Sequence, residues 1–274
     1  MKQEKTEIDR ELESGKYLFK YCKFDVNALQ IIINKTLFFS SPDKLNDPLD
    51  SQFDLKIKNP DNFSKETKEI IRESTSNLSE EIRELLRDDG SELGHITSQE
   101  KLFKEYFTYI QNTYSGICCF SQTHSDNLLW AHYADQARGL CFVFDREKLH
   151  ESFQKNLKGS NYRIMHDKIS YNGVKKLDLR LFKGGEFDYT SAHLFSKTSH
   201  WKYEKEYRFV LEKYKKTLFR LTIERFNPFF DFDADCLKYV ITGQRMPYEH
   251  FLMLFRIIAD TKLNVELCKH EFDQ

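Results

Sequence analysis

The sequence predicts an α+β fold: one domain spanning residues 1–274, with a mixed, mostly antiparallel sheet of short strands and flanking helices. Short apolar stretches typical of strands are mixed irregularly with helical patterns, and no strand–helix–strand unit repeats along the chain. The 24 Phe and 14 Tyr residues supply large apolar side chains for a single core, although only 40% of the chain is hydrophobic. No linker or low-complexity segment divides the chain.

The first sixty residues contain a predicted strand, helix and strand in succession. Residues 17–21 have the apolar pattern of a strand, and Asp25 stands where a side chain would cap the helix that follows. A short strand is expected at 36–40. The loop after it, residues 41–48, holds two Pro and two Asp residues, which restrict the backbone and cap turns.

Strand patterns dominate from residue 115 onward. A buried strand is expected at 116–121, followed by a helix that Ser125 or Asp126 caps and that runs through Ala137. Gly139 is expected to end this helix as a left-handed residue. The later strands are expected at 140–144, 164–171, 204–211, 218–223, 238–242 and 264–268, with a helix at 247–260.

Residues 61–113 have a different character and predict a helical insertion within the domain. Apolar residues such as Ile71, Ile82 and Leu85 fall at helical spacing amid dense charge. We expect this insertion to pack on the body of the protein and to supply no catalytic group, because amphipathic segments of this kind more often pack than react.

The overall charge and the cysteines exclude several classes of protein. The chain has 42 Lys and Arg against 43 Asp and Glu, so no net field favours nucleic acid or a membrane. No apolar run approaches the roughly 20 residues that span a bilayer, and the charged N-terminus is unlike a secretion signal. The six Cys residues form no CxxC pair, and His124, Asp126 and His132 match no strong zinc spacing. We therefore expect a cytoplasmic protein with no membrane partner and no metal.

Residues 201–211 carry the most informative polar pattern. Because strand side chains alternate between faces, Glu204, Glu206 and Arg208 would share one face of a strand. One interpretation is a solvated face on which Arg208 bridges a carboxylate. The other is a pair of carboxylates lining a cleft, where one orients a substrate hydroxyl or stabilises a developing cation. The sequence leaves both open.

A second polar cluster lies where the strand 116–121 gives way to a helix. Ser121 ends the strand, and the junction of a strand end with a helix start often holds an anionic group. Trp130, His132 and Tyr133 on the helix are expected to wall a pocket. His132 is also typical of a half-buried histidine that is satisfied by a hydrogen bond.

A third cluster follows the first strand and its loop. Lys20 and Tyr21 end the strand, and Asn46 and Asp47 lie in the loop. Lys20 would either extend from the surface or stand at the edge of a cleft, and the two loop residues would either build the turn or face that cleft. Because each polar cluster lies at the end of an apolar strand, we expect them to converge with Ser121 and the two glutamates around one cleft.

Four motifs in this chain occur in a fixed order. They are Phe-Lys-Tyr at 19–21, the loop motif at 37–48, the run from Cys-Phe-Ser to Cys-Phe-Val-Phe at 119–144, and Trp-Lys-Tyr-Glu-Lys-Glu-Tyr-Arg at 201–208. The combination resembles a bacterial family of domains of unknown function, number 2971, over nearly the whole chain. Phe19 stands where that family has Tyr, and Leu129 where Met is usual. The resemblance implies a fold and no activity.

The order of the parts is also similar to the ADP-ribosyltransferase fold. Lys20 or Tyr21, Ser121 and the two glutamates would occupy the places that this superfamily uses, although its first-strand residue is usually Arg or His, which Lys does not replace in phosphate contacts. The similarity implies NAD as a co-substrate, with Glu206 contacting the nicotinamide ribose and supporting an oxocarbenium-like transition state. Glu204 would orient the acceptor, while Ser121 and Tyr21 hold the nicotinamide side. The other residues expected to bind the cofactor are Asn46, Asp47, Trp130, His132, Tyr133 and Arg208.

The similarity to the ADP-ribosyltransferase fold implies an NAD-consuming enzyme, an ADP-ribosyltransferase or NAD glycohydrolase, that acts on a nucleotide substrate as an effector of bacterial anti-phage defence or of a toxin system. The acceptor would be a protein or a nucleic acid. One alternative is a metal-dependent, nuclease-like effector that uses Asp47, His132, Glu204 and Glu206 around a divalent ion. The other is a non-enzymatic module that binds a partner through the helices of residues 61–113.

Overall fold

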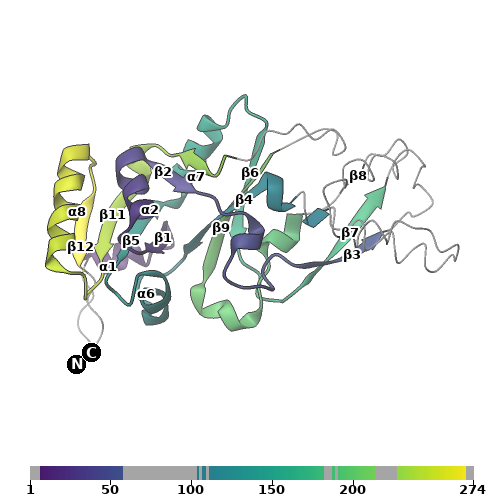
Figure 1. Ribbon diagram of the computed structural model, residues 1–274, viewed down its shortest axis with the longest axis horizontal. Helices are drawn as coiled ribbons and strands as arrows, with labels where there is room; N and C mark the ends of the chain where they lie inside the picture. The colour runs from purple at the N-terminus through teal and green to yellow at the C-terminus, as the bar shows by residue number, and fades with distance from the viewer. Residues whose placement is uncertain are drawn as a thin grey trace, which may run out of the picture.

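In the computed structural model, residues 7–57, 104, 107–108, 111–181, 187–188, 191–213 and 227–269 are described. At the centre is a seven-stranded sheet (Figure 1). Its strands are β1 (Tyr17–Cys22), β4 (Ser115–Ser121), β5 (Leu140–Asp145), β6 (Tyr162–Lys168), β9 (Glu206–Lys213), β11 (Leu237–Thr242) and β12 (Glu266–Lys269). They lie in the order β12-β11-β5-β1-β4-β9-β6, and only the pair of β11 and β12 is parallel. The predicted α+β fold with a mixed, mostly antiparallel sheet is confirmed.

Smaller sheets and helices surround this sheet. β2 (Thr36–Phe38) pairs with β10 (Phe229–Asp231), while β3 (Phe53–Ile57) and β8 (Phe187–Asp188) flank β7 (Lys175–Leu181). The α-helices with described bounds are α1 (Glu7–Leu12), α2 (Val26–Leu29), α6 (Asn127–Tyr133), α7 (Arg146–Asn156) and α8 (Tyr248–Thr261). A π-helical turn, η1, spans Gln30–Asn34. The 3₁₀ turns with described bounds are η2 (Pro42–Lys44), η4 (Ser191–Phe195), η5 (Ser199–Glu204) and η6 (Ala234–Cys236).

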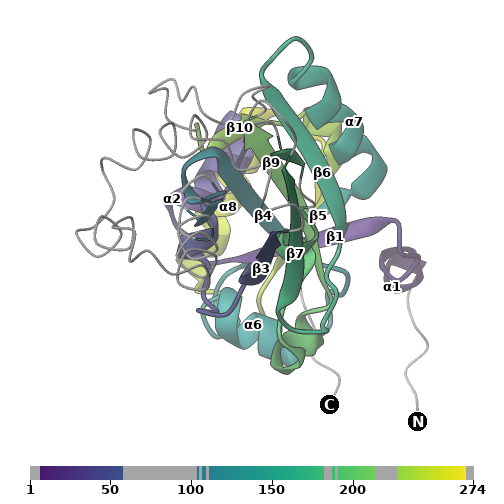
Figure 2. The same cartoon turned by 90° about the vertical axis from the view of Figure 1, so that its right-hand side faces the viewer.

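Both faces of the central sheet are covered, which explains why β5 is buried at every position. Phe142 and Phe144 of β5 belong to the larger core, with side chains from α2, α7 and α8. Cys141 and Val143, which alternate with them, belong to a second cluster with α1 and α6. Figure 2 shows α1 on the opposite side of the sheet from α2 and α8.

Several predicted elements are confirmed at nearly the expected bounds, among them β1, β5, β11 and α8. Asp25 caps α2, as predicted, because its carboxylate accepts the backbone N–H groups of Asn27 and Ala28 at 2.9 and 3.3 Å. α7 was not predicted, because its largely polar sequence contains only three buried residues, Leu149, Ser152 and Phe153. The strand expected at 218–223 lies outside the described residues, as does most of the insertion 61–113; its few described residues are helical.

The helix expected through Ala137 is shorter than predicted. α6 ends at Tyr133, and residues 135–137 follow with positive φ values of 49°, 56° and 64°. The prediction that Gly139 is a left-handed cap is wrong, since its φ is not positive. Gly139 is instead a point of close backbone approach, where an added Cβ would lie 2.3 Å from the Cys22 carbonyl oxygen and 3.0 Å from that of Ala134. Only glycine fits there without moving β1 away from the start of β5.

A Gly139→Ala variant is therefore expected to lose about 3 kcal/mol of unfolding free energy, at the upper end of the usual cost of overpacking. Urea denaturation of the two proteins measures this difference. Gly159→Ala is the matched control, because Gly159 has a φ of 82° and open space around its missing Cβ. That control should cost about 1–2 kcal/mol, from backbone strain alone. Equal losses in the two variants would contradict the close-approach explanation.

Candidate functional site

A cavity of about 280 Å³ opens among six parts of the chain. They are β1, β4, the end of η5, β9, the loop around η2, and α6. The prediction that the polar clusters converge is confirmed, because residues from all of them line this one cavity. The predicted residues that line it are Lys20, Tyr21, Asn46, Ser121, Tyr133, Glu204, Glu206 and Arg208. Their proposed roles in binding or catalysis remain predictions.

Strand register explains why residues so distant in sequence meet here. β4 lies between β1 and β9, and Ser121 is the partner of Phe19 on one side and of Glu206 on the other. The end of β4 and the start of β9 therefore lie beside the middle of β1. Ser121 also fixes the turn before β9, because its hydroxyl donates to the backbone carbonyl of Glu204 at 2.7 Å.

The predicted strand 204–211 begins two residues late. Glu204 is the last residue of η5, and Lys205 then takes a left-handed φ of 44° before β9 starts at Glu206. The interpretation of a solvated strand face is wrong: the side chain of Arg208 is completely buried, and those of Glu204 and Glu206 are only 6% and 4% exposed. The carboxylates and the guanidinium thus belong to the interior of the protein.

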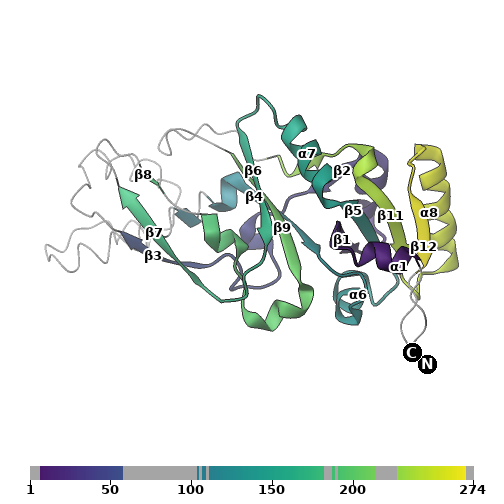
Figure 3. The same ribbon diagram turned by 180° about the vertical axis from the view of Figure 1, so that it is seen from behind.

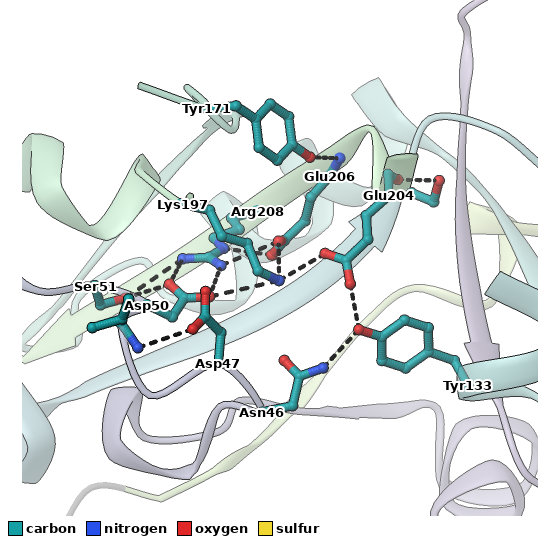
Figure 4. A network of polar contacts seen from close by, with 12 residues as sticks. Asn46, Asp47, Asp50, Ser51, Tyr133, Tyr171, Lys197, Glu204, Glu206 and Arg208 are labelled. Atoms are coloured by element: carbon teal, nitrogen blue, oxygen red, sulfur yellow. Dashed lines mark hydrogen bonds and ion pairs between the residues drawn. The ribbon is translucent and has the colours of Figure 1, made fainter. Parts of the chain in front are cut away.

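Arg208 is the centre of a buried polar network (Figure 4). Its Nη1 and Nη2 donate to the two carboxylate oxygens of Asp50 at 2.8 and 2.5 Å, and its Nε donates to Glu206 Oε1 at 2.5 Å. Nη1 also donates to the backbone carbonyl of Leu194 at 2.8 Å. This fork-like pairing is the geometry in which a buried guanidinium is best satisfied.

Lys197 is the second cation of the network, and it joins the two glutamates. Its Nζ donates to Glu204 Oε2 at 2.7 Å and to Glu206 Oε2 at 3.2 Å, and it lies 4.6 Å from the centre of the Trp201 ring. Burial opposes the charge of Glu206, but Arg208 and Lys197 outweigh it and lower the pKa of Glu206 to about 2. Glu206 is therefore ionised at neutral pH and held from both sides.

Glu204 has a different environment. Burial raises the pKa of its carboxyl above 4.5, although Lys197 and Tyr133 act in the opposite direction. The Tyr133 hydroxyl donates to Glu204 Oε1 and accepts a hydrogen bond from the Asn46 amide at 2.7 Å. Figure 4 shows this chain of contacts on the side of Glu204 away from Arg208.

The charges of the network do not balance. Asp50, Glu204 and Glu206 supply three carboxylates, whereas Lys197 and Arg208 supply two cations. Because the pKa of Glu206 is lowered and that of Glu204 is raised, Glu204 is the carboxylate of this pair that binds a proton more readily. Two adjacent carboxyl groups whose pKa values are pushed apart are the arrangement from which general acid–base catalysis is built.

A second pair of cations lines the cavity outside this network. The ammonium group of Lys20 donates to the backbone carbonyl of Cys119 at 3.1 Å and lies 5.2 Å from the centre of the Phe120 ring. An ammonium group has three donors, so a ligand can take those that the protein leaves. The side chain of Lys44 is 74% exposed and 3.8 Å from Asp43.

Asp47 lies beside the cavity without lining it, on the same loop as Asp50. Its Oδ1 accepts the backbone N–H of Leu49 at 2.9 Å. Its Oδ2 is buried and has no hydrogen-bond partner in the described part of the chain. The prediction that Asp47 builds the turn is thus confirmed, and one carboxylate oxygen remains available to a neighbouring group.

The prediction that Trp130 and His132 wall the pocket is wrong. Trp130 is completely buried in the second core cluster, where its ring meets Tyr21 edge-to-face at 5.1 Å. It therefore supports the cavity from behind, through Tyr21. His132 is exposed on the outer side of α6 and lies near Tyr203, so it is not the half-buried histidine of the other interpretation. In the described part of the chain, no group of three or more His, Cys, Asp or Glu is placed to hold a metal ion.

Two members of the network, Asp50 and Lys197, were missed by the sequence interpretation. Lys197 lies in the polar stretch Ser196-Lys-Thr-Ser199, which has neither strand nor helix periodicity. The sign that could have pointed to them is Arg208 itself, because an Arg next to the apolar run Phe-Val-Leu of a core strand requires buried carboxylates around it.

Among the helices with described residues, none is long and apolar enough to cross a membrane. No curated protein and no solved structure matches the chain. A family model described as "Protein of unknown function (DUF2971)" matches residues 129–209. This stretch runs from α6 to β9 and contains Tyr133, Lys197, Glu204, Glu206 and Arg208. The part of the chain that carries most of the polar network is therefore similar to that family.

Proposed function

We propose that the protein is an enzyme that cleaves the bond between nicotinamide and ribose in NAD, and that it passes the ADP-ribose to water or to an acceptor. The observation that carries the proposal is the pair of cavity-lining carboxyls with opposite pKa shifts, Glu204 raised and Glu206 lowered. Cleavage of a glycosidic bond needs a fixed negative environment and a base for the incoming hydroxyl, and such carboxyl pairs supply both in other glycoside-cleaving enzymes.

The two glutamates would have different tasks in this reaction. As the bond breaks, nicotinamide leaves with the electron pair, and positive charge develops on the ribose. An oxygen of water or of the acceptor then bonds to the ribose carbon and loses its proton. Glu204 would receive that proton, because a carboxylate with a raised pKa is the stronger base. Glu206 is already neutralised by Lys197 and Arg208, so it would act chiefly by holding Lys197 against Glu204.

The rest of the cavity supports a nucleotide as the substrate. Lys20 and Lys44 are cations outside the buried network and suit the pyrophosphate of a dinucleotide. At about 280 Å³, the cavity is at the small end of ligand sites, which span roughly 300–1,000 Å³. It therefore suits the nicotinamide ribose half of NAD, with the adenosine half outside. Six free cysteines are consistent with the reducing cytoplasm in which NAD is abundant.

The test is release of nicotinamide from NAD by the purified protein, followed by chromatography with and without EDTA. We expect release that EDTA does not change and that Glu204→Gln removes. Glu151→Gln, on the exposed side of α7, is the matched control and should keep full activity. If NAD stays intact both alone and with a cell extract as the source of acceptors, the proposal is wrong. Cleavage of DNA or RNA that EDTA abolishes would favour the nuclease-like alternative instead.

A further inference from the structure

α8 presents a second apolar face to solvent. Leu254 is completely buried, and Ile257 and Ile258 pack beside it on the body of the protein. On the other side of the helix, Tyr248 and Phe255 are 69% and 58% exposed. Leu252, between them at helical spacing, is 36% exposed, so the three side chains form one outward ridge. Aromatic and aliphatic groups clustered in this way typically mark an interaction surface.

Two opposite charges run beside this ridge. Glu249 and Arg256 are seven residues apart, two helical turns, and therefore lie on the same side of α8. Both are exposed, and neither has an ion-pair partner in the described part of the chain. Met253, 50% exposed, lies between them. The outer surface of α8 thus consists of an apolar ridge with a row of residues beside it. This row has a negative charge, Glu249, toward the start of the helix and a positive charge, Arg256, toward its end.

We propose that this surface binds a second copy of the same chain, with the two α8 helices antiparallel. In a twofold dimer, the same patch of each copy forms the interface. Residues on one side of the axis in one copy must therefore complement those on the other side of the axis in the second copy. An axis next to Leu252 and Met253 places Glu249 of each copy against Arg256 of the other. The same axis lays the Tyr248–Phe255 ridges along each other. In this antiparallel orientation, each charge of α8 therefore meets the opposite charge of the second copy. A partner of different sequence would not require α8 to complement itself in this way.

The position of α8 agrees with a role separate from the cavity. Figures 1 and 3 show α8 at one end of the molecule, beside β12 at the edge of the sheet. The cavity lies among β1, β4 and β9, so a dimer through α8 would leave it open. A helix of 14 residues is about 21 Å long, and one helix pair is a small interface. We expect a weak dimer, with a dissociation constant on the order of 10–100 µM.

The apolar part of the surface is tested by sedimentation equilibrium of the full chain from about 5 to 300 µM, a range that spans the expected constant. Wild type is expected to shift from monomer to dimer across this range. Phe255→Asp should remain monomeric, because it buries a charge in the ridge. Leu128→Asp, at a 49% exposed position on α6, is the matched control and should dimerise like wild type. A wild-type protein that stays monomeric at every concentration would overturn the proposal.

The charges test the orientation. Glu249→Arg and Arg256→Glu each place like charges against each other across the twofold axis, and each should weaken the dimer at least tenfold. The double variant Glu249→Arg/Arg256→Glu restores opposite charges and should dimerise as wild type does. All three changes are at exposed positions of a helix, so circular dichroism should show unchanged folding. Dimerisation that ignores both single changes, or that the double change fails to restore, would rule out the antiparallel α8 pair.

Discussion

Replacing Arg208 with Met is expected to lower the unfolding free energy by about 3–5 kcal/mol, the usual cost of removing one partner from a buried ion pair. Met keeps most of the volume of the Arg side chain, so the loss comes from charge. Asp50 would lose both of its hydrogen bonds to the guanidinium, and Glu206 would lose one of its two cationic partners and keep Lys197. The backbone carbonyl of Leu194 would lose its donor as well.

Guanidinium denaturation of wild type and Arg208→Met at pH 7 measures this loss. Lys155→Met is the matched control, because Lys155 forms an exposed ion pair with Asp233, and removal of such a pair should change the unfolding free energy little. The pH dependence gives a second measurement. The pKa of Glu206 is lowered to about 2, so its ionised form stabilises the wild-type protein above pH 4.5, and this stabilisation is lost as the pH falls from 4.5 toward 2. Similar losses in the two variants would contradict a central role for Arg208.

Glu204→Gln is expected to reduce nicotinamide release by a factor of about 10²–10⁴, the range that a positioned general base contributes. Its folding should change little, because the variant removes the excess negative charge of the network and keeps an oxygen that Tyr133 can donate to. Burial raises the pKa of Glu204, so wild-type activity should rise with pH through a value above 4.5, as the carboxyl loses its proton. Full activity in Glu204→Gln would exclude it as the base.

The Glu206→Gln variant distinguishes the role of Glu206 from that of Glu204. It withdraws one of three carboxylates that neutralise Lys197 and Arg208, so we expect a clear loss of melting temperature. If Glu206 also supports the developing cation directly, as the sequence resemblance implies, the folded variant should in addition lose about 10²–10³ in rate. Melting curves and nicotinamide release on the same samples distinguish these outcomes.

The sequence predicted the neighbourhood of the site because strand ends can be recognised locally. Ser121 and Lys20 each follow an apolar run, and the alternation from Glu206 to Arg208 shows that the two side chains share a face. In the structure, the end of β4 and the start of β9 lie beside the middle of β1, next to Lys20, so these local signs identify one cavity.

The members that the sequence did not reveal depend on contacts between distant segments. Asp50 is 158 positions from Arg208, and nothing in the sequence around Asp50 distinguishes it from Asp47, which does not join the network. The left-handed φ of Lys205 is equally hidden, because the sequence pattern of a strand continues through it. The prediction that Trp130 lines the pocket failed for a different reason. A large aromatic residue on a helix is equally compatible with a pocket wall and with the core, and only the packing decides between them.

The position of β1 has a consequence for how the chain is made. β1 precedes the other six strands of the sheet in the chain and leaves the ribosome before them, yet it is the middle strand, between β4 and β5. Its main hydrogen-bonding partner, β5, is complete only at residue 145. At the usual 5–20 residues per second, β1 therefore waits roughly 5–20 s for β4 and roughly 6–25 s for β5. During that time an apolar strand of a nascent chain is available to chaperones and to neighbouring chains, and the cavity cannot exist until synthesis has passed β9.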